Sequence, residues 1–266
     1  MIKKLRSESG FTLLEVAIVL LVVSILLGYT VAMYPVQQEL KQKRAVNDEM
    51  NRIIDAIYAY AQVNGRLPCA ASLALRNGSP DAEDGNASPD NGTECNQWYG
   101  YLPAKTLGID GRYDVDKLLL DPWGNPYRYQ VTANDTGAGA GPEELGVAGG
   151  DFIMPNDIKN VSMANLDPDL EICTAVANPT PTNCGPATVT VAEGIPAVVL
   201  SLGKNGATAP AESNIQLENT DNSATDTVFI RSTISDVEGA EFDDIVKWVA
   251  PNTLYSKMID AGQLPN

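Results

Sequence analysis

The stretch GFTLLEVAIVLLVVSILL (residues 10–27) decides how this chain is organised. It opens an apolar run from Phe11 to Tyr34, in which Glu15 is the one charged position. At about 1.5 Å per residue, a run of this length crosses the ~30 Å hydrocarbon core of a membrane as a single helix. We therefore expect residues 11–34 to form a transmembrane helix.

The ten residues before this run, MIKKLRSESG, carry the cations Lys3, Lys4 and Arg6. Cations in front of a first apolar segment keep the N-terminus in the cytoplasm, so the rest of the chain is expected outside it. A secretory signal peptide is cleaved after its apolar segment and is lost from the mature protein. Cleavage between Gly10 and Phe11 would instead leave the membrane helix on the mature chain.

Glu15 is the second unusual feature of this segment. A carboxylate inside a membrane helix costs several kcal/mol unless it is paired or lies near an interface. One interpretation is a stray acid at the level of the headgroups. The other starts from cleavage before Phe11, which would create a new α-amine there. Glu15 of one copy could then neutralise the Phe11 amine of a neighbouring copy.

Taken together, the basic leader, Gly10, Phe11, Glu15 and the apolar helix resemble the processing segment of type IV pilins and type II secretion pseudopilins. The resemblance implies a prepilin peptidase that cuts after Gly10 and N-methylates Phe11, and it implies that Glu15 is the assembly carboxylate. It also implies a structural filament subunit whose partners are other subunits and an inner-membrane assembly platform. The expected location is the inner membrane before assembly and a periplasmic or extracellular filament afterwards.

An amphipathic pattern follows the apolar run, with apolar residues three or four positions apart, as one face of a helix requires. These residues are Val36, Leu40, Val46, Met50, Ile53, Ile54, Ile57, Tyr58 and Ala61. Asn64-Gly65 is a helix stop signal. We predict one helix from about Thr12 to Asn64, with a kink where Pro35 removes a backbone hydrogen bond.

Residues 66–266 are richer in Gly, Pro, Asn, Asp and Ser and contain short strand-like runs bounded by turn residues. The predicted strands are 127–132, 188–192, 197–202, 227–231 and 245–249, and a last helix is predicted over 251–261. The predicted fold class is α+β, a long N-terminal helix with a globular head built on an antiparallel sheet. The predicted domains are a leader (1–10), a helical stem (11–65) and an extracytoplasmic head (66–266).

The four cysteines are Cys69, Cys95, Cys173 and Cys184, and none of them forms a CxxC pair. Four cysteines allow three pairings. Because the head is expected outside the cytoplasm, we favour disulfides over buried thiols. The pairing between sequence neighbours, Cys69–Cys95 and Cys173–Cys184, is the one we predict.

Three segments of the predicted head also resemble pseudopilins: DPWGNPY (121–127), SLGKNG (201–206) and DDIVKW (243–248). The first is expected to be a tight turn with a structural role. In some pseudopilins the loop between the second and third segments binds calcium, so a Ca²⁺ site is one expectation here and the absence of any cofactor is the other. The calcium candidates are Asp221, Asp226, Asp243 and Asp244.

The amino-acid composition excludes some classes of function. The chain has 18 Lys+Arg against 34 Asp+Glu and no His, for a net charge of −16. No His-based catalytic or zinc site is therefore available, and an acidic surface does not favour a nucleic-acid partner. The function that we predict is a minor or specialised filament subunit and not an enzyme. The alternatives are a DNA-uptake pilin, a membrane-anchored binding domain and an anchored enzyme that uses acid pairs such as Glu143-Glu144.

Overall fold

The computed structural model describes residues 12–71, 95, 98–132, 152, 158, 166–176, 183–206, 219, 227–235, 237 and 242–264, without the side chains of residues 30–32. The chain divides into two compact units, Met1–Ala45 and Val46–Asn266. Helix α1 (Leu13–Asn64) begins in the first unit and ends in the second. It continues through Pro35, so the predicted single helix from residue 12 to residue 64 is confirmed.

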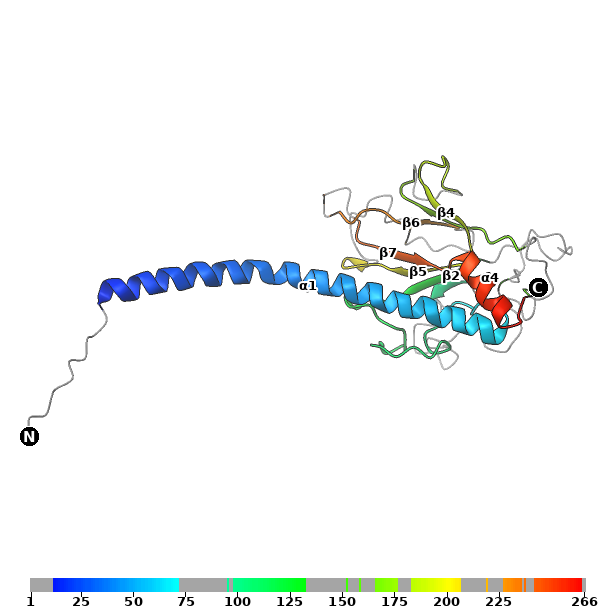
Figure 1. The fold of residues 1–266 in the computed structure, drawn as a ribbon, viewed down its shortest axis with the longest axis horizontal. Helices are drawn as coiled ribbons and strands as arrows, with labels where there is room; N and C mark the ends of the chain where they lie inside the picture. Colours follow the sequence, from blue (N-terminus) through cyan, green and yellow to red (C-terminus); the bar gives the residue numbers. More distant parts are fainter. Residues whose placement is uncertain are drawn as a thin grey trace, which may run out of the picture. The chain divides into compact units, whose positions relative to one another are not determined.

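The second unit is built on a four-stranded antiparallel sheet (Figure 1). Its strands lie in the order β1 (Tyr99–Tyr101), β2 (Arg128–Val131), β5 (Ala197–Ser201) and β7 (Ile245–Trp248). Every neighbouring pair in this sheet is antiparallel. Together with α1, this sheet confirms the α+β class with an antiparallel sheet.

A smaller sheet lies beside the first in the order β4, β3, β6. Its strands are β4 (Thr190–Ile195), β3 (Leu170–Cys173) and β6 (Val228–Ile230). β3 and β4 are antiparallel, whereas β3 and β6 are parallel. The head is therefore not antiparallel throughout, because β6 reaches β3 after a long connection and not through a hairpin.

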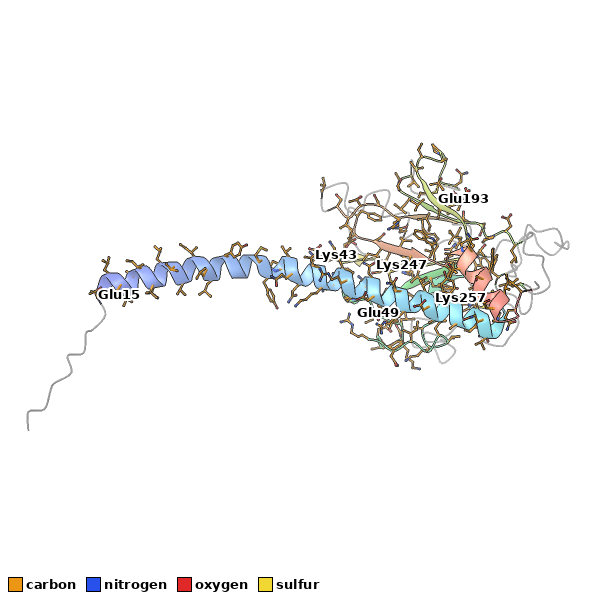
Figure 2. The ribbon with its side chains drawn as sticks, in the orientation of Figure 1. Glu15, Lys43, Glu49, Glu193, Lys247 and Lys257 are labelled. Carbon is orange, nitrogen blue, oxygen red and sulfur yellow. A yellow bond between two sulfur atoms is a disulfide. The ribbon has the colours of Figure 1, made fainter. Side chains whose placement is uncertain are left out.

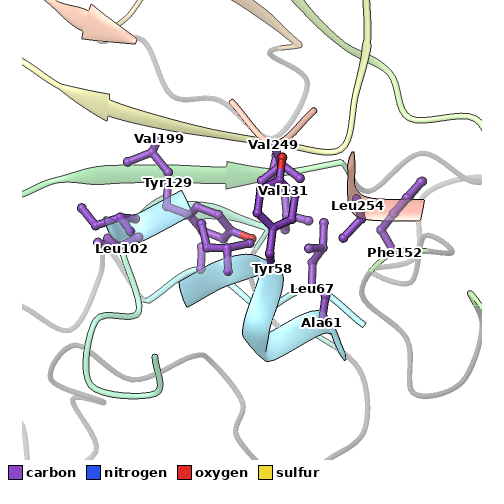
Figure 3. Packing of buried hydrophobic residues seen from close by; sticks show 14 of the residues in the cluster. Tyr58, Ala61, Leu67, Leu102, Tyr129, Val131, Phe152, Val199, Val249 and Leu254 are labelled. Carbon is purple, nitrogen blue, oxygen red and sulfur yellow. The ribbon is translucent and has the colours of Figure 1, made fainter. Parts of the chain in front are cut away.

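The core of the second unit forms on both faces of β5. Ala197 and Val199 belong to the cluster that contains the buried face of α1, whereas Val198 and Leu200 pack with residues of β3 and β7. This follows from the alternation of side chains along a strand. On α1, the buried face consists of Val46, Met50, Ile53, Ile57, Tyr58 and Ala61. Figure 3 shows part of this packing close up.

Helix α4 (Pro251–Asp260) closes the second unit against the last turns of α1. It has Pro at its start, as predicted, and buries Leu254 and Met258 in the main core. The Ala250 amide donates to the Tyr58 hydroxyl (2.9 Å), and the Gln263 side chain donates to the carbonyl of Gln62 (3.0 Å). These contacts fix the C-terminal segment to α1.

Candidate assembly site and the junction of the second unit

The first unit consists mainly of an apolar helix surface that no other described residue covers. The most apolar part of α1 has no buried residue, and α1 is long and apolar enough to cross a membrane. Leu13 is 92% and Leu14 71% exposed. Water-exposed apolar surface of this extent is not stable on a soluble protein, so it requires lipid or other protein chains around it.

Thr12 and Glu15 form the start of α1. The backbone N–H of Glu15 donates to the Thr12 hydroxyl (3.2 Å) and to the Thr12 carbonyl (3.1 Å), so Thr12 is the N-cap of the helix. Glu15 lies in the first turn and is the acidic residue there (Figure 2). No hydrogen bond or ion pair of its carboxylate is found among the described residues.

We did not predict the cap, although the sequence contains its signature. Thr12-Leu-Leu-Glu15 is an S/T-x-x-E pattern in front of an apolar run, which is typical of a helix start. The negative charge of Glu15 at this position also interacts favourably with the helix dipole. The predicted processing residues Gly10 and Phe11 lie outside the described residues.

In the second unit, Asp121 organises a junction between the segments 121–127 and 201–206. Its Oδ1 accepts three backbone N–H groups, from Trp123 (3.0 Å), Gly124 (2.8 Å) and Asn125 (2.9 Å). Its Oδ2 accepts the Ser201 hydroxyl (2.7 Å). Burial raises the pKa of Asp121, and the hydrogen bonds from Asn125, Ser201 and the other donors only partly offset that effect.

The segment 243–248 joins the same junction, because the Asp243 carboxylate accepts backbone N–H groups of the segment 201–206. The Asn125 side chain donates to the Gly203 carbonyl (2.6 Å), and Asp243 Oδ2 accepts the N–H groups of Lys204 (2.5 Å) and Asn205 (3.0 Å). Gly203 has φ +62, and a Cβ there would lie 2.4 Å from the Asp243 carbonyl oxygen. The three segments therefore meet in a junction with a structural role.

A second polar contact connects this region to α1. The Tyr127 hydroxyl donates to Glu49 Oε2 (2.8 Å), and Arg52 lies 3.8 Å from the other carboxylate oxygen of Glu49. Burial and the Glu49 carboxylate raise the pKa of Tyr127, which keeps the hydroxyl protonated as a donor. DPWGNPY thus fixes the start of β2 both to the loop after β5 and to α1.

The cysteines form two disulfides, Cys69–Cys95 and Cys173–Cys184. These are the pairs between sequence neighbours. Glu171 lies beside the second disulfide: one of its carboxylate oxygens and the Sγ atoms of Cys173 and Cys184 all lie within 4.8 Å of one another. Because the two sulfurs are bonded to each other and Glu171 Oε2 accepts the Cys184 N–H (2.8 Å), the group is a disulfide with a neighbouring carboxylate.

Two of the four calcium candidates, Asp243 and Asp244, belong to the described residues, and both accept hydrogen bonds. Asp221 and Asp226 lie outside the described residues, and Asp243 already accepts two backbone N–H groups. Asp244 Oδ2 accepts the side-chain N–H of the buried Asn219 (2.9 Å).

The orientation of the Asn219 amide follows from its other contacts. Its Oδ1 accepts the N–H of Ile230 (2.7 Å) and its Nδ2 donates to the Ile230 carbonyl (3.0 Å). Asn219 therefore turns N–H groups, not oxygen, towards Asp244, whereas Ca²⁺ requires converging oxygens.

Comparison with known proteins agrees with the N-terminal features. The family described as the prokaryotic N-terminal methylation motif matches residues 5–31. Over 128 aligned residues the chain is 28% identical to the type II secretion system core protein G of Vibrio cholerae serotype O1. The aligned region covers 48% of this chain and 73% of that protein. No solved structure matches the chain. The resemblance to prepilin-type proteins is thereby confirmed.

Proposed function

We propose that this chain is a structural subunit of a type IV pilus-like or type II secretion pseudopilus filament. One observation carries the proposal: an apolar helix surface that no other described residue covers, with a single carboxylate, Glu15, in its first turn, inside the segment that matches a methylation motif. The similarity to a core protein of a type II secretion system supports the same class. We expect no enzymatic role.

The proposed pathway begins at the membrane. The helix anchors the precursor with its N-terminus in the cytoplasm and residues 66–266 in the periplasm. A prepilin peptidase removes the leader, residues 1–10, by cutting after Gly10 and methylating Phe11. The helical stem, residues 11–65, then leaves the lipid and enters a filament with the help of an assembly platform.

Glu15 has the central part in this transfer. In lipid, its carboxylate is costly unless it has a partner. Processing supplies one, because the amine of Phe11 on a neighbouring subunit is a cation at the same depth. The pair neutralises both groups, and the apolar side chains around them exchange lipid for other stems. Assembly therefore depends on the charge of Glu15, whereas insertion does not.

The finer assignment is a minor or specialised subunit, which we base on the large region 66–266 and its two disulfides. A DNA-uptake pilin is the alternative. Such a protein needs cations to contact phosphates. The net charge of −16 does not favour it.

The first test is the mature N-terminus, read by mass spectrometry from membranes of cells that express this chain with a prepilin peptidase. We expect N-methylated Phe11. A chain that keeps Met1, or one cut beyond Tyr34, would overturn the filament proposal, since neither could present the amine that Glu15 needs.

The second test is assembly of Glu15→Ala, with Glu39→Ala as the matched control. Glu39 is another acid on α1, but it pairs with Lys43 within the same chain. We expect Glu15→Ala to insert into the membrane and to form no filaments, while Glu39→Ala assembles. Equal assembly of both variants would contradict the role of Glu15.

A further inference from the structure

Some charged residues of α1 between positions 39 and 52 form ion pairs within the chain, and others do not. Two ion pairs form among the described residues, Glu39 with Lys43 and Glu49 with Arg52. In both of them the acid precedes the base, which is the favourable order along a helix. Arg44 and Asp48 are also one turn apart, but here the base comes first, and both side chains are exposed with no ion pair among the described residues.

Lys247 is a cation near Asp48, but its hydrogen bonds go elsewhere. Its ammonium donates to Asn51 Oδ1 and to the Asn47 carbonyl. Burial lowers the pKa of Lys247, and the negative charge of Asp48 offsets only part of this shift. Asp48 thus presents an exposed carboxylate on α1, and Arg44 an exposed guanidinium.

The proposed contact between Glu15 and the Phe11 amine of a neighbour sets an offset between parallel stems. A cation at one position faces an acid four positions later in the next copy, since 15 − 11 is 4. Arg44 and Asp48 have the same offset and the same order, because 48 − 44 is also 4. Both differences, 44 − 11 and 48 − 15, are 33, so one displacement between identical copies aligns both pairs.

In a regular helix, the spacing of 33 positions also nearly repeats the angular position of a side chain. At 3.6 residues per turn, 33 positions of a regular helix correspond to about nine turns plus about 60°. The long arginine side chain can cover that angular difference. Other offsets are also conceivable for charged stems: seven positions would align Lys41 with Asp48, and eleven would align Arg44 with Asp55.

We infer that Arg44 of one subunit forms an ion pair with Asp48 of the neighbouring subunit, which is a second copy of this chain. This inference rests on the proposed function, because the Glu15 contact sets the offset of four. The pair lies beyond the apolar segment, where charges steer and select register more than they add affinity. It gives the stem one polar register contact at each end of its apolar segment.

Site-specific crosslinking tests the register. Two differently tagged chains, Arg44→Cys and Asp48→Cys, are co-expressed in cells that assemble the wild type, and the filaments are oxidised. We expect a disulfide dimer that carries both tags. The matched control pairs are Lys41→Cys with Asp48→Cys and Arg44→Cys with Asp55→Cys. A mixed dimer in either control, with none in the first pair, would overturn the inference in favour of another offset.

Charge exchange tests the attraction itself. Arg44→Asp and Asp48→Arg, made singly, should each lower the yield of sheared filaments by about tenfold or more, because each substitution places like charges together at every subunit contact. The double variant Arg44→Asp/Asp48→Arg should recover most of the yield. Membrane insertion of all three variants is measured as the control for folding.

The two proposals fail differently. If the single variants assemble as well as the wild type while Glu15→Ala does not, the Arg44–Asp48 pair is wrong and the filament function stands. If Glu15→Ala assembles normally, the role of Glu15 is wrong and the offset of four has no basis, so the Arg44–Asp48 pair falls while the filament function stands. A double variant that stays as poor as the single ones would also contradict the pair.

Discussion

The Ser201 hydroxyl donates a 2.7 Å hydrogen bond to Asp121 Oδ2, although the two residues are 80 positions apart in the chain. Asp121 is 1% exposed and Ser201 is fully buried. The bond connects the turn before β2 to the end of β5, which are neighbours in the four-stranded sheet. The turn and the sheet are therefore stabilised by one carboxylate.

We expect Asp121→Ala to destabilise the protein strongly and Asp121→Asn to be much milder. Alanine would leave the three backbone donors of the turn and the Ser201 hydroxyl without an acceptor, at about 1–3 kcal/mol for each buried group that water cannot reach. An asparagine oxygen can still accept the three N–H groups. Urea unfolding of the full chain in detergent, followed by tryptophan fluorescence, measures both. Equal losses in the two variants would contradict this account.

The same carboxylate should make stability depend on pH. Burial raises the folded-state pKa of Asp121 above its ordinary value of 3.8. The resulting contribution of Asp121 to the unfolding free energy is therefore fully present below a pH equal to that ordinary pKa. The contribution is lost as the pH rises through the raised folded-state pKa. The unfolding free energy of the wild type minus that of Asp121→Asn should therefore fall across this window. Asp169, whose pKa burial also raises, is present in both chains and cancels in the difference.

A difference that is flat, or that rises with pH, would show that Asp121 is not desolvated in the folded protein.

Tyr127→Phe should cost more stability than Tyr129→Phe. Both rings are buried and phenylalanine fills almost the same volume, so the hydroxyl contacts decide the outcome. Tyr127 donates to the charged Glu49, and such a bond contributes about 1.5–3 kcal/mol. Tyr129 donates to the neutral carbonyl of Pro68, for which about 1 kcal/mol is expected.

Glu49→Gln provides the third corner of a double-mutant cycle for this contact, and unfolding free energies are again measured in urea. If the losses of unfolding free energy in Tyr127→Phe and Glu49→Gln add up to the loss in the double variant, the two groups do not interact and the assigned bond is wrong.

The long helix could be predicted because its signal is local and repeated. The apolar run and the spacing of Val46, Met50, Ile53 and Ile57 both follow α-helical geometry, and they determine α1 almost to the residue. The strands β2, β5 and β7 were also predicted within a residue or two, since each is a short apolar or β-branched run between turn residues.

Two strands were missed for physical reasons. β1 (Tyr99–Tyr101) has only three residues and Gly100 at its centre, and glycine weakens a strand pattern. The glycine is required by its surroundings, because a Cβ would lie 2.2 Å from the Ala71 carbonyl oxygen. β3 (Leu170–Cys173) contains Glu171 and pairs with β6, more than fifty residues later, so its signal is tertiary.

The junction of the second unit shows the same division. The segments around Asp121, Ser201 and Asp243 stood out in the sequence, but nothing local predicts that they meet through one carboxylate and a set of backbone N–H groups. The asparagine that contacts Asp244 was also missed, because the role of Asn219 depends on Ile230 and Asp244, which are distant in sequence.

Thr12→Ala should loosen the first turn of α1, whereas Thr12→Ser should leave it intact. The Thr12 hydroxyl accepts the Glu15 N–H, and loss of an N-cap acceptor costs about 1 kcal/mol. In hydrogen exchange of the full chain in detergent, we expect protection of the Glu15 amide to fall about fivefold in the alanine variant. Serine keeps the acceptor and so controls for the size and position of the substitution. Equal protection in the alanine and serine variants would mean that the cap does not hold this turn, and that the orientation of Glu15 for assembly must come from elsewhere.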